Sequence, residues 1–395
     1  MNKQADQLFH FGQVRDVYSD KLTEARFYRS SLNALQPIIT TQDGLTALAT
    51  RLAAANAFAV DTEFLRERTY RAELCLIQVA TSDTAACIDP ILLPELAALA
   101  QPLTLGSAVK VMHACRQDLE VLYPVAGLVG PVFDTQIAAA LTGAPAQVGY
   151  ADLVRRLLGC DLAKAHTRTD WSVRPLSPEQ IEYALDDVRY LLPLKAHLEG
   201  QIERLGRTAW LEEELAALAS AGNFSVDPQA AWLRVKGLHG LDATRARLLR
   251  DLAAWRERRA IDRNRPRGWI LEEAALREIV LRVPRTHAQL AGVADLPAST
   301  LKHCGEEILA CIAASGIPEP PPPLDPRVRP DPARTALVRK LADLNQAIAL
   351  ELGMSSEVLT TRRELEQLAD GRRDLPVLHG WRHGVVGERL VAACS

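Results

Sequence analysis

The residues with the clearest chemical potential are two carboxylates one residue apart, Asp61 and Glu63, which follow the apolar run at 58–60. This pattern predicts a buried strand that leads into an acidic site. Because side chains alternate along a strand, both carboxylates would lie on one face and raise each other's pKa. A divalent cation such as Mg²⁺ or Mn²⁺, which favours oxygen ligands, would offset that repulsion. An isolated pair of this kind is also typical of a solvated strand end.

Four further positions could join such a site. Asp118 lies in the first turn of a predicted helix just after a predicted strand, where open α/β sheets bind substrates, although an acid there also complements the helix dipole. Tyr183 and Asp187 are four residues apart and therefore share one face of a helix, as an ordinary surface pair would. Asp134 precedes a Thr-Gln pair, which indicates a helix cap or a supporting acid.

The elements that would position these residues form an α/β domain with a mixed sheet flanked by helices, because predicted strands come first and helices follow. A helix from Thr41, with Leu45, Leu48 and Leu52 at helical spacing, leads into the acidic strand. Further strands are predicted at 74–80, 85–89 and 109–113, and further helices at 117–122, 134–141, 150–158 and 177–198.

The rest of the chain indicates helical domains joined by linkers. Residues 228–315 show helical periodicity and no convincing strand. Eight of the 16 residues from Ile317 to Pro332 are proline, which is typical of a semi-rigid spacer. The predicted boundaries are an N-terminal extension at 1–40, the α/β domain at 41–205, a linker helix at 206–227, a helical domain at 228–315, a proline-rich linker at 316–330 and a second helical domain at 331–395.

Composition places the protein among ordinary globular proteins. Its 395 residues, 48% apolar and 24% charged, are enough for several hydrophobic cores. The seven cysteines are scattered and contain no C-x-x-C pair, which argues against a zinc site or a disulfide framework and favours a reducing cytoplasm. We expect neither export nor membrane insertion, because the sequence shows no signal peptide and no apolar run of spanning length. It also shows no phosphate-binding or dinucleotide fingerprint, so no nucleotide cofactor is expected.

One stretch is strongly basic. Residues 245–267 contain nine arginines and three acids, a local net charge of +6. Arginine is suited to phosphate contacts, so this stretch predicts a nucleic-acid-binding surface. The alternative is a solvated helix face.

In combination these motifs resemble a known family. Asp61-x-Glu63, Asp118 and Tyr183-x-x-x-Asp187 are similar to the DEDDy group of 3′-5′ exonucleases, which has the ribonuclease H-like fold. Longer strings narrow the resemblance to the bacterial ribonuclease D family, with residues 228–315 similar to its HRDC (helicase and ribonuclease D C-terminal) domain and residues 331–395 more weakly similar to a second copy. The strings are Val60-Asp61-Thr62-Glu63-Phe64 with Arg68-Thr69-Tyr70, His113-Ala114 with Asp118-Leu119-Glu120, and Arg168-Thr169-Asp170-Trp171 with Arg174-Pro175-Leu176.

The resemblance implies hydrolysis assisted by two divalent cations, Mg²⁺ or Mn²⁺, with release of nucleoside 5′-monophosphates from a 3′ end. It implies that Asp61 bridges both ions, that Glu63 and Asp187 complete the ion on the nucleophile side, and that Asp118 holds the leaving-group side through water. Tyr183 would orient the attacking water, because an ordinary tyrosine pKa near 10 makes a poor base at neutral pH.

Substrate contacts are predicted from residues around the last motif. Lys164, Arg168 and Arg174 offer cations, and Trp171 offers a stacking face for a terminal base, although a tryptophan is as often buried. His113 is predicted to be mainly structural. The resemblance implies RNA with an accessible 3′ end as partner, tRNA precursors in particular. The alternatives are a single-strand DNA exonuclease of the proofreading or repair type and a non-catalytic RNA-binding scaffold.

Overall fold

The computed structural model describes residues 38–162, 169–220, 222, 224, 227–238, 241–318 and 331–394. Residues 1–37 of the predicted N-terminal extension are therefore outside the described part of the chain. Residues 319–330 of the predicted proline-rich linker are outside it as well. Contacts divide the chain into two units. Unit 1 combines the described residues up to 64 with residues 74–220 and those from 336 onward, and unit 2 combines residues 65–73 with those of 222–335. Among the described helices, none is both long and apolar enough to cross a bilayer.

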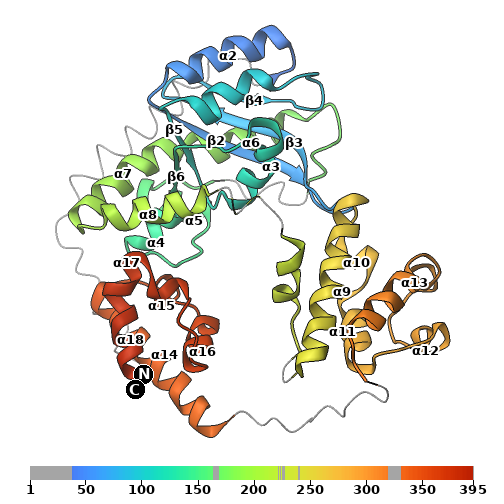
Figure 1. The fold of residues 1–395 in the computed structure, drawn as a ribbon. Helices are drawn as coiled ribbons and strands as arrows, with labels where there is room; N and C mark the ends of the chain where they lie inside the picture. Colours follow the sequence, from blue (N-terminus) through green and yellow to red (C-terminus); the bar gives the residue numbers. More distant parts are fainter. Residues whose placement is uncertain are drawn as a thin grey trace, which may run out of the picture. The chain divides into compact units, whose positions relative to one another are not determined.

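Unit 1 contains a six-stranded mixed sheet with the order β1-β4-β3-β2-β5-β6 (Figure 1). Parallel pairing joins β1 to β4, β2 to β5 and β5 to β6, whereas β3 and β4 are antiparallel. The predicted α/β class is confirmed. The strands are β1 (Ile38–Ile39), β2 (Ala57–Leu65), β3 (Glu73–Ala80), β4 (Ala85–Ile88), β5 (Val109–Met112) and β6 (Val132–Asp134). Sequence reasoning missed β1 and β6, because runs of 2 and 3 residues are too short to show an alternation.

Helices flank this sheet in unit 1. The first begins as predicted, because the Thr41 side chain caps it by accepting a hydrogen bond from the backbone N–H of Gly44. Two later helices cover strands, α6 against β4 and α7 against β5. The helices of this part are α2 (Gln42–Ala54), α3 (Arg116–Ala126), α4 (Thr135–Leu141), α5 (Tyr150–Leu158), α6 (Pro178–Arg189), α7 (Leu191–Arg204) and α8 (Thr208–Leu218).

The helix predicted at 177–198 is two helices in the structure. It starts with a capping box between Ser177 and Gln180, and α6 then ends at Arg189. Pro193 lies in the first turn of α7, where its missing N–H costs nothing, whereas its ring would clash with the carbonyl of residue 189 in a continuous helix. The break therefore follows from one proline that the apolar periodicity conceals.

The C-terminal helices belong to unit 1, although the sequence predicted a separate domain there. In unit 1, Trp381 stacks on Trp210 of α8, with ring centroids 4.4 Å apart. Arg207 is 6% exposed and donates hydrogen bonds to the carbonyls of Leu141 and Leu352, at the ends of α4 and α14. The predicted linker helix thus provides packing for this segment. The helices of the C-terminal segment are α14 (Pro332–Leu352), α15 (Ser356–Leu359), α16 (Arg362–Ala369), α17 (Gly380–Arg382) and α18 (Glu388–Ala393).

Unit 2 is helical and has its own core. Leu248, Leu252 and Trp255, which the sequence placed at helical spacing, are buried in that core. The Tyr70 hydroxyl donates to the buried Glu257, so residues 65–73 pack with these helices. The elements are a 3₁₀ segment η4 (Pro228–Arg234) and the helices α9 (Ala243–Asp262), α10 (Arg267–Ile270), α11 (Glu273–Arg282), α12 (His287–Ala291) and α13 (Ala298–Ala314).

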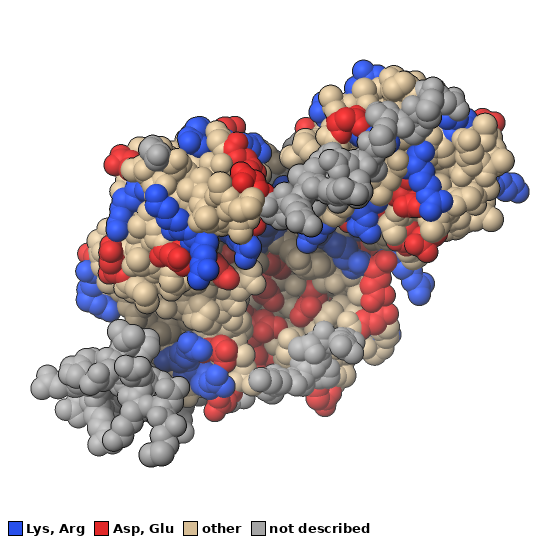
Figure 2. All heavy atoms as spheres, turned by 90° about the horizontal axis from the view of Figure 1, so that it is seen from below, with Lys and Arg blue, Asp and Glu red and all other residues tan. Residues whose placement is uncertain are grey.

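Only some of the arginines in the basic stretch at 245–267 are exposed. Arg245 and Arg256 are 2% and 5% exposed, and Arg259 pairs with Glu307. These three guanidinium groups stabilise the helical unit and are poorly placed to contact phosphates. The exposed members are Arg247, Arg250, Arg258, Arg263 and Arg265. Figure 2 shows acidic and basic side chains intermixed over the face that it displays. The local net charge of +6 that the sequence gives for residues 245–267 therefore overstates how basic the exposed surface of this stretch is.

Candidate active site

The acidic strand lies inside the sheet, as the apolar run predicts. Strand β2 lies between β3 and β5, and Phe58, Ala59 and Val60 are fully buried. Asp61 and Glu63 then follow on one face, because the period of two brings alternate side chains to the same side. Residues Asp61 and Glu63 each keep part of their surface exposed, so this face of the strand is accessible.

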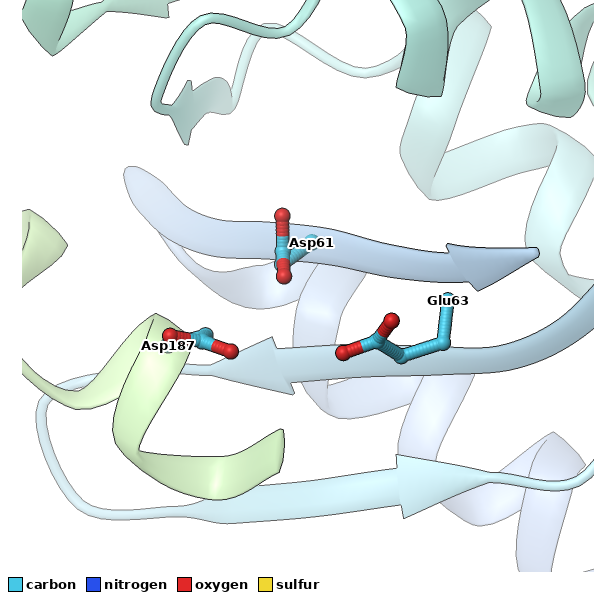
Figure 3. A group of neighbouring side chains, drawn as sticks. All are labelled: Asp61, Glu63 and Asp187. Atoms are coloured by element: carbon cyan, nitrogen blue, oxygen red, sulfur yellow. The ribbon is translucent and has the colours of Figure 1, made fainter. Parts of the chain in front are cut away.

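A third carboxylate reaches the same place from a distant part of the sequence. Asp187 lies in the last turn of α6, and its carboxylate, together with those of Asp61 and Glu63, offers oxygens that all lie within 4.8 Å of one another. Figure 3 shows the three carboxylates from strand and helix converging on one space. An all-oxygen donor set of this kind suits Mg²⁺ or Mn²⁺. Elsewhere in the described part of the chain, no second such group of His, Cys, Asp or Glu was found.

Burial and mutual repulsion disfavour the ionised forms of these three groups. Burial, and after it the charges of Asp118 and Asp187, raises the pKa of Asp61 well above its usual range. Burial and the neighbouring charges raise the pKa of Glu63 to about 8, and mainly burial raises that of Asp187 to about 7. A divalent cation would favour the ionised forms and reverse these shifts.

Asp118 lies beside the cluster and is not one of its three closest members. It occupies the first turn of α3, is 8% exposed, and accepts a hydrogen bond from the Thr62 hydroxyl. Burial raises the pKa of Asp118 to about 6, and its own charge raises the pKa values of Asp61 and Glu63, so it acts on the same site. The Thr62 hydroxyl lies between the two acids on β2 and therefore links Asp118 to the strand that carries Asp61 and Glu63.

Tyr183 completes the predicted set. It lies one helical turn before Asp187 on α6 and is half-buried. Burial, followed by the charges of Asp187 and Glu63, raises the pKa of its hydroxyl above the usual value. The hydroxyl is therefore a neutral hydrogen-bonding group at neutral pH, which fits orientation of a water molecule and does not fit a general base.

Asp134 is a helix cap, as predicted. Its carboxylate accepts hydrogen bonds from the N–H groups of Gln136 and Ile137 at the start of α4. It also accepts from the N–H groups of Ala114 and Cys115, in the turn that leads into α3. This one buried acid therefore fixes the turn before α3, the helix that carries Asp118.

Of the four residues predicted to contact substrate, the structure describes two. Lys164 and Arg168 lie outside the described residues. Trp171 is 4% exposed and packs on Tyr183, so its ring is covered where base stacking would need an open face. Arg174 binds Asp89 and three backbone carbonyls, so its guanidinium is held inside the fold and away from any phosphate. The sequence could not reveal these long-range partners.

Two supporting residues were missed by sequence reasoning. The Tyr150 hydroxyl donates to the carbonyl of Asp186 and accepts from the N–H of Tyr190, and so ties the end of α6 that carries Asp187. Nothing in its spacing could have identified it. Thr62 had a signal, because a hydroxyl between two acids on a buried strand must face the opposite side of the sheet. His113 bonds Thr135 and the carbonyl of Val148, in agreement with its predicted structural role.

Two family models match parts of the chain. Residues 36–203 match the model of a 3′-5′ exonuclease family, and residues 245–312 match that of the HRDC domain. The family models do not reach the predicted second HRDC copy at 331–395, which stays a prediction.

Relatives match over most of their length. Ribonuclease D of Jannaschia sp. (strain CCS1) is 41% identical over 88% of this chain and 92% of its own. Ribonuclease D of Granulibacter bethesdensis is 38% identical over 90% and 91%. The crystal structure of Escherichia coli RNase D, described as an exoribonuclease involved in structured RNA processing, aligns with a TM-score of 0.80 at 31% identity and covers 90% of this chain and 97% of that one.

Proposed function

Because the chain belongs to the ribonuclease D family of 3′-5′ exoribonucleases, we propose that it removes nucleotides one at a time from RNA 3′ ends with the help of two divalent cations. The observation that carries the proposal is the convergence of Asp61, Glu63 and Asp187, whose oxygens lie within 4.8 Å of one another. Such a group is stable in its ionised form only with added positive charge.

The residues take distinct roles in this reaction. Asp61 would contact both cations, Glu63 and Asp187 would hold the one near the attacking water, and Asp118 would serve the leaving-group side. When bound, the cations supply a more acidic water and offset the charge on the departing 3′ oxygen. Tyr183 donates or accepts a hydrogen bond that orients the water, because its hydroxyl stays neutral. Water adds to phosphorus as the bond from phosphorus to the 3′ oxygen of the preceding nucleotide breaks, which releases a nucleoside 5′-monophosphate.

RNA precursors with extended 3′ ends, tRNA precursors among them, are the substrates that we propose. Their support is the description of the E. coli relative as an enzyme of structured RNA processing, together with a helical unit that matches the HRDC domain. The reducing cytoplasm is the proposed compartment, and it agrees with the state of the seven cysteines, none of which is in a disulfide.

The proposed function is tested with matched single-stranded RNA and DNA oligonucleotides labelled at the 5′ end. We expect a ladder that shortens from the 3′ end of RNA in Mg²⁺ or Mn²⁺, with nucleoside 5′-monophosphates as product. The expected rate on RNA exceeds that on DNA by about tenfold or more, through contacts to the 2′-hydroxyl. A faster reaction on DNA would favour a DNA exonuclease, and RNA binding without product would favour a non-catalytic scaffold.

Exposed arginines of unit 2 are expected to supply part of the RNA affinity. Changing Arg258, Arg263 and Arg265 together to glutamine removes three exposed cations and leaves the buried Arg245 and Arg256 in place. The dependence of log K on log salt should become shallower by up to about 2, since each lost phosphate contact on a single strand contributes about 0.7. Fluorescence anisotropy of labelled RNA at several salt concentrations measures this slope.

The matched control changes the same number of exposed arginines in unit 1, namely Arg156, Arg204 and Arg372. It alters the net charge by the same amount and should change the slope less. Equal slopes for the two triple variants would show that overall charge, and no particular surface of the helical unit, determines binding. Deletion of residues 228–395 is a poorer test, because it also removes helices that pack in unit 1.

A further inference from the structure

The segment at 169–176, which directly precedes α6, is held by one buried arginine. Arg174 donates from Nε and Nη2 to the two carboxylate oxygens of Asp89, at 2.6 and 3.0 Å, and the side chains are 14% and 0% exposed. Nη2 also donates to the carbonyl of Cys75 on β3, at 2.7 Å. A guanidinium that binds a carboxylate with two parallel bonds has a defined orientation, so Arg174 anchors the segment to the ends of β3 and β4.

The same guanidinium fixes the position of a tryptophan. Its Nη1 donates to the carbonyl of Trp171, at 2.6 Å, and to that of Val173, at 2.9 Å. A turn shapes the backbone here, because the Asp170 carboxylate accepts from the N–H and the hydroxyl of Ser172. The backbone of Trp171 is therefore held on both sides, and its ring is 4% exposed.

This ring packs against the proposed catalytic tyrosine. The ring centroids of Trp171 and Tyr183 are 6.2 Å apart, and their planes differ by 29°. Tyr183 is half-buried, and the charges of Asp187, Glu63 and Asp61 act on its hydroxyl. A tyrosine on a helix surface can turn about two side-chain torsions, so a rigid aromatic neighbour restricts where the hydroxyl points.

We propose that Trp171, held by the ion pair of Arg174 and Asp89, is a positioning residue that keeps the Tyr183 hydroxyl directed at the carboxylate cluster. The inference rests on the proposed function, because it assigns Tyr183 the task of orienting the attacking water. It replaces the sequence-based expectation that Trp171 stacks on a base and that Arg174 contacts the substrate. Trp171 contacts no reacting atom and acts through the tyrosine.

A double-mutant cycle tests the proposal. Trp171→Leu should lower kcat by about tenfold or more, because a small displacement of a catalytic group is costly, and KM for the RNA should change by less than about twofold. Tyr183→Phe removes the hydroxyl outright, so Trp171→Leu should have no additional effect on kcat in that background. Effects that multiply in the double variant, or an unchanged kcat in Trp171→Leu, would overturn the proposal.

A second measurement does not depend on activity. In protein labelled with fluorotyrosine and freed of metal, the ¹⁹F resonance that disappears in Tyr183→Phe belongs to Tyr183. We expect it to shift or broaden in Trp171→Leu and to stay unchanged in Val173→Ala, which alters a side chain that is 57% exposed in the same segment. An identical resonance in wild type and Trp171→Leu would also overturn the proposal.

A further variant covers the case in which Trp171→Leu does not fold. Arg174→Lys keeps the positive charge and loses the two-pronged contact, so it should loosen the segment and lower kcat in the wild-type background only. Failure of this inference is distinguishable from failure of the proposed function. A wild-type protein that releases no monophosphates contradicts the function, whereas an active wild type with independent effects at Trp171 and Tyr183 contradicts the positioning role alone.

Discussion

Asp61→Asn is expected to reduce the rate of nucleotide release by about a thousandfold or more while leaving the fold intact. The charges of Asp118, Asp187 and Glu63 all act on Asp61, and we propose that it would contact both cations. Losing a charge that contributes several kcal/mol of transition-state stabilisation corresponds to about three factors of ten. The measurement is kcat for release of nucleoside 5′-monophosphates at saturating RNA and metal.

The substitution should also change stability in a direction that distinguishes it from damage to the fold. Without metal, asparagine removes one of four mutually repelling carboxylates, so the variant should melt at the same temperature as the wild type or higher. Metal should then stabilise it less than the wild type. Asp152→Asn, at an exposed position on α5, is the matched control and should behave like wild type. Activity of Asp61→Asn within tenfold of wild type would refute the site assignment.

Chelation of divalent cations is expected to abolish activity and to leave a protein whose stability falls as the pH rises. Burial raises the pKa of Glu63 to about 8, that of Asp187 to about 7 and that of Asp118 to about 6, whereas unfolded carboxyls titrate near 4. Between about pH 4 and 8 the folded protein therefore binds more protons than the unfolded chain. The free energy of unfolding that these groups contribute is present in full below about pH 4 and is lost as the pH rises through 6 to 8.

Metal should reverse this trend, because the cations bind ionised carboxylates and displace the protons. The increase in melting temperature on adding Mn²⁺ should be larger at pH 8 than at pH 6, and calorimetry in buffers of different ionisation enthalpy should detect released protons. Thermal melts of chelated and metal-loaded protein from pH 5 to 8.5 provide the first measurement. Asp61→Asn should show a weaker dependence on pH and on metal. A metal-induced shift that is independent of pH would show that the cluster does not hold the ions.

The faces that several site residues occupy could be predicted, because these residues lie in short, regular sequence patterns. The placement of Asp61 and Glu63 on one face follows from the period of a strand, and that of Tyr183 and Asp187 follows from the period of a helix. The capping role of Asp134 follows from its neighbours in the sequence. These features depend on residues within one turn or a few strand positions, so no distant part of the chain can change them easily.

Other features depend on partners far away in the sequence. Trp171 and Arg174 look like substrate-binding residues in isolation, and only the contacts with Tyr183 and Asp89 show that they belong to the interior. Two arginines of the basic helix α9 turn inward for the same reason. The helices after residue 331 pack in unit 1, where Trp381 stacks on Trp210. These two tryptophans are 171 positions apart in the sequence, so no periodicity indicates their contact.

The sequence by itself determined which side chains could hold cations, which face of each element they occupy and which family the chain resembles. The tertiary structure alone decided that oxygens of Asp61, Glu63 and Asp187 meet within 4.8 Å, that Asp118 accepts a hydrogen bond from Thr62, and which aromatic and basic residues are buried. The physical reason is that hydrogen-bonded strands and helices impose short periods along the chain, whereas burial and charge coupling arise between segments that only folding brings together.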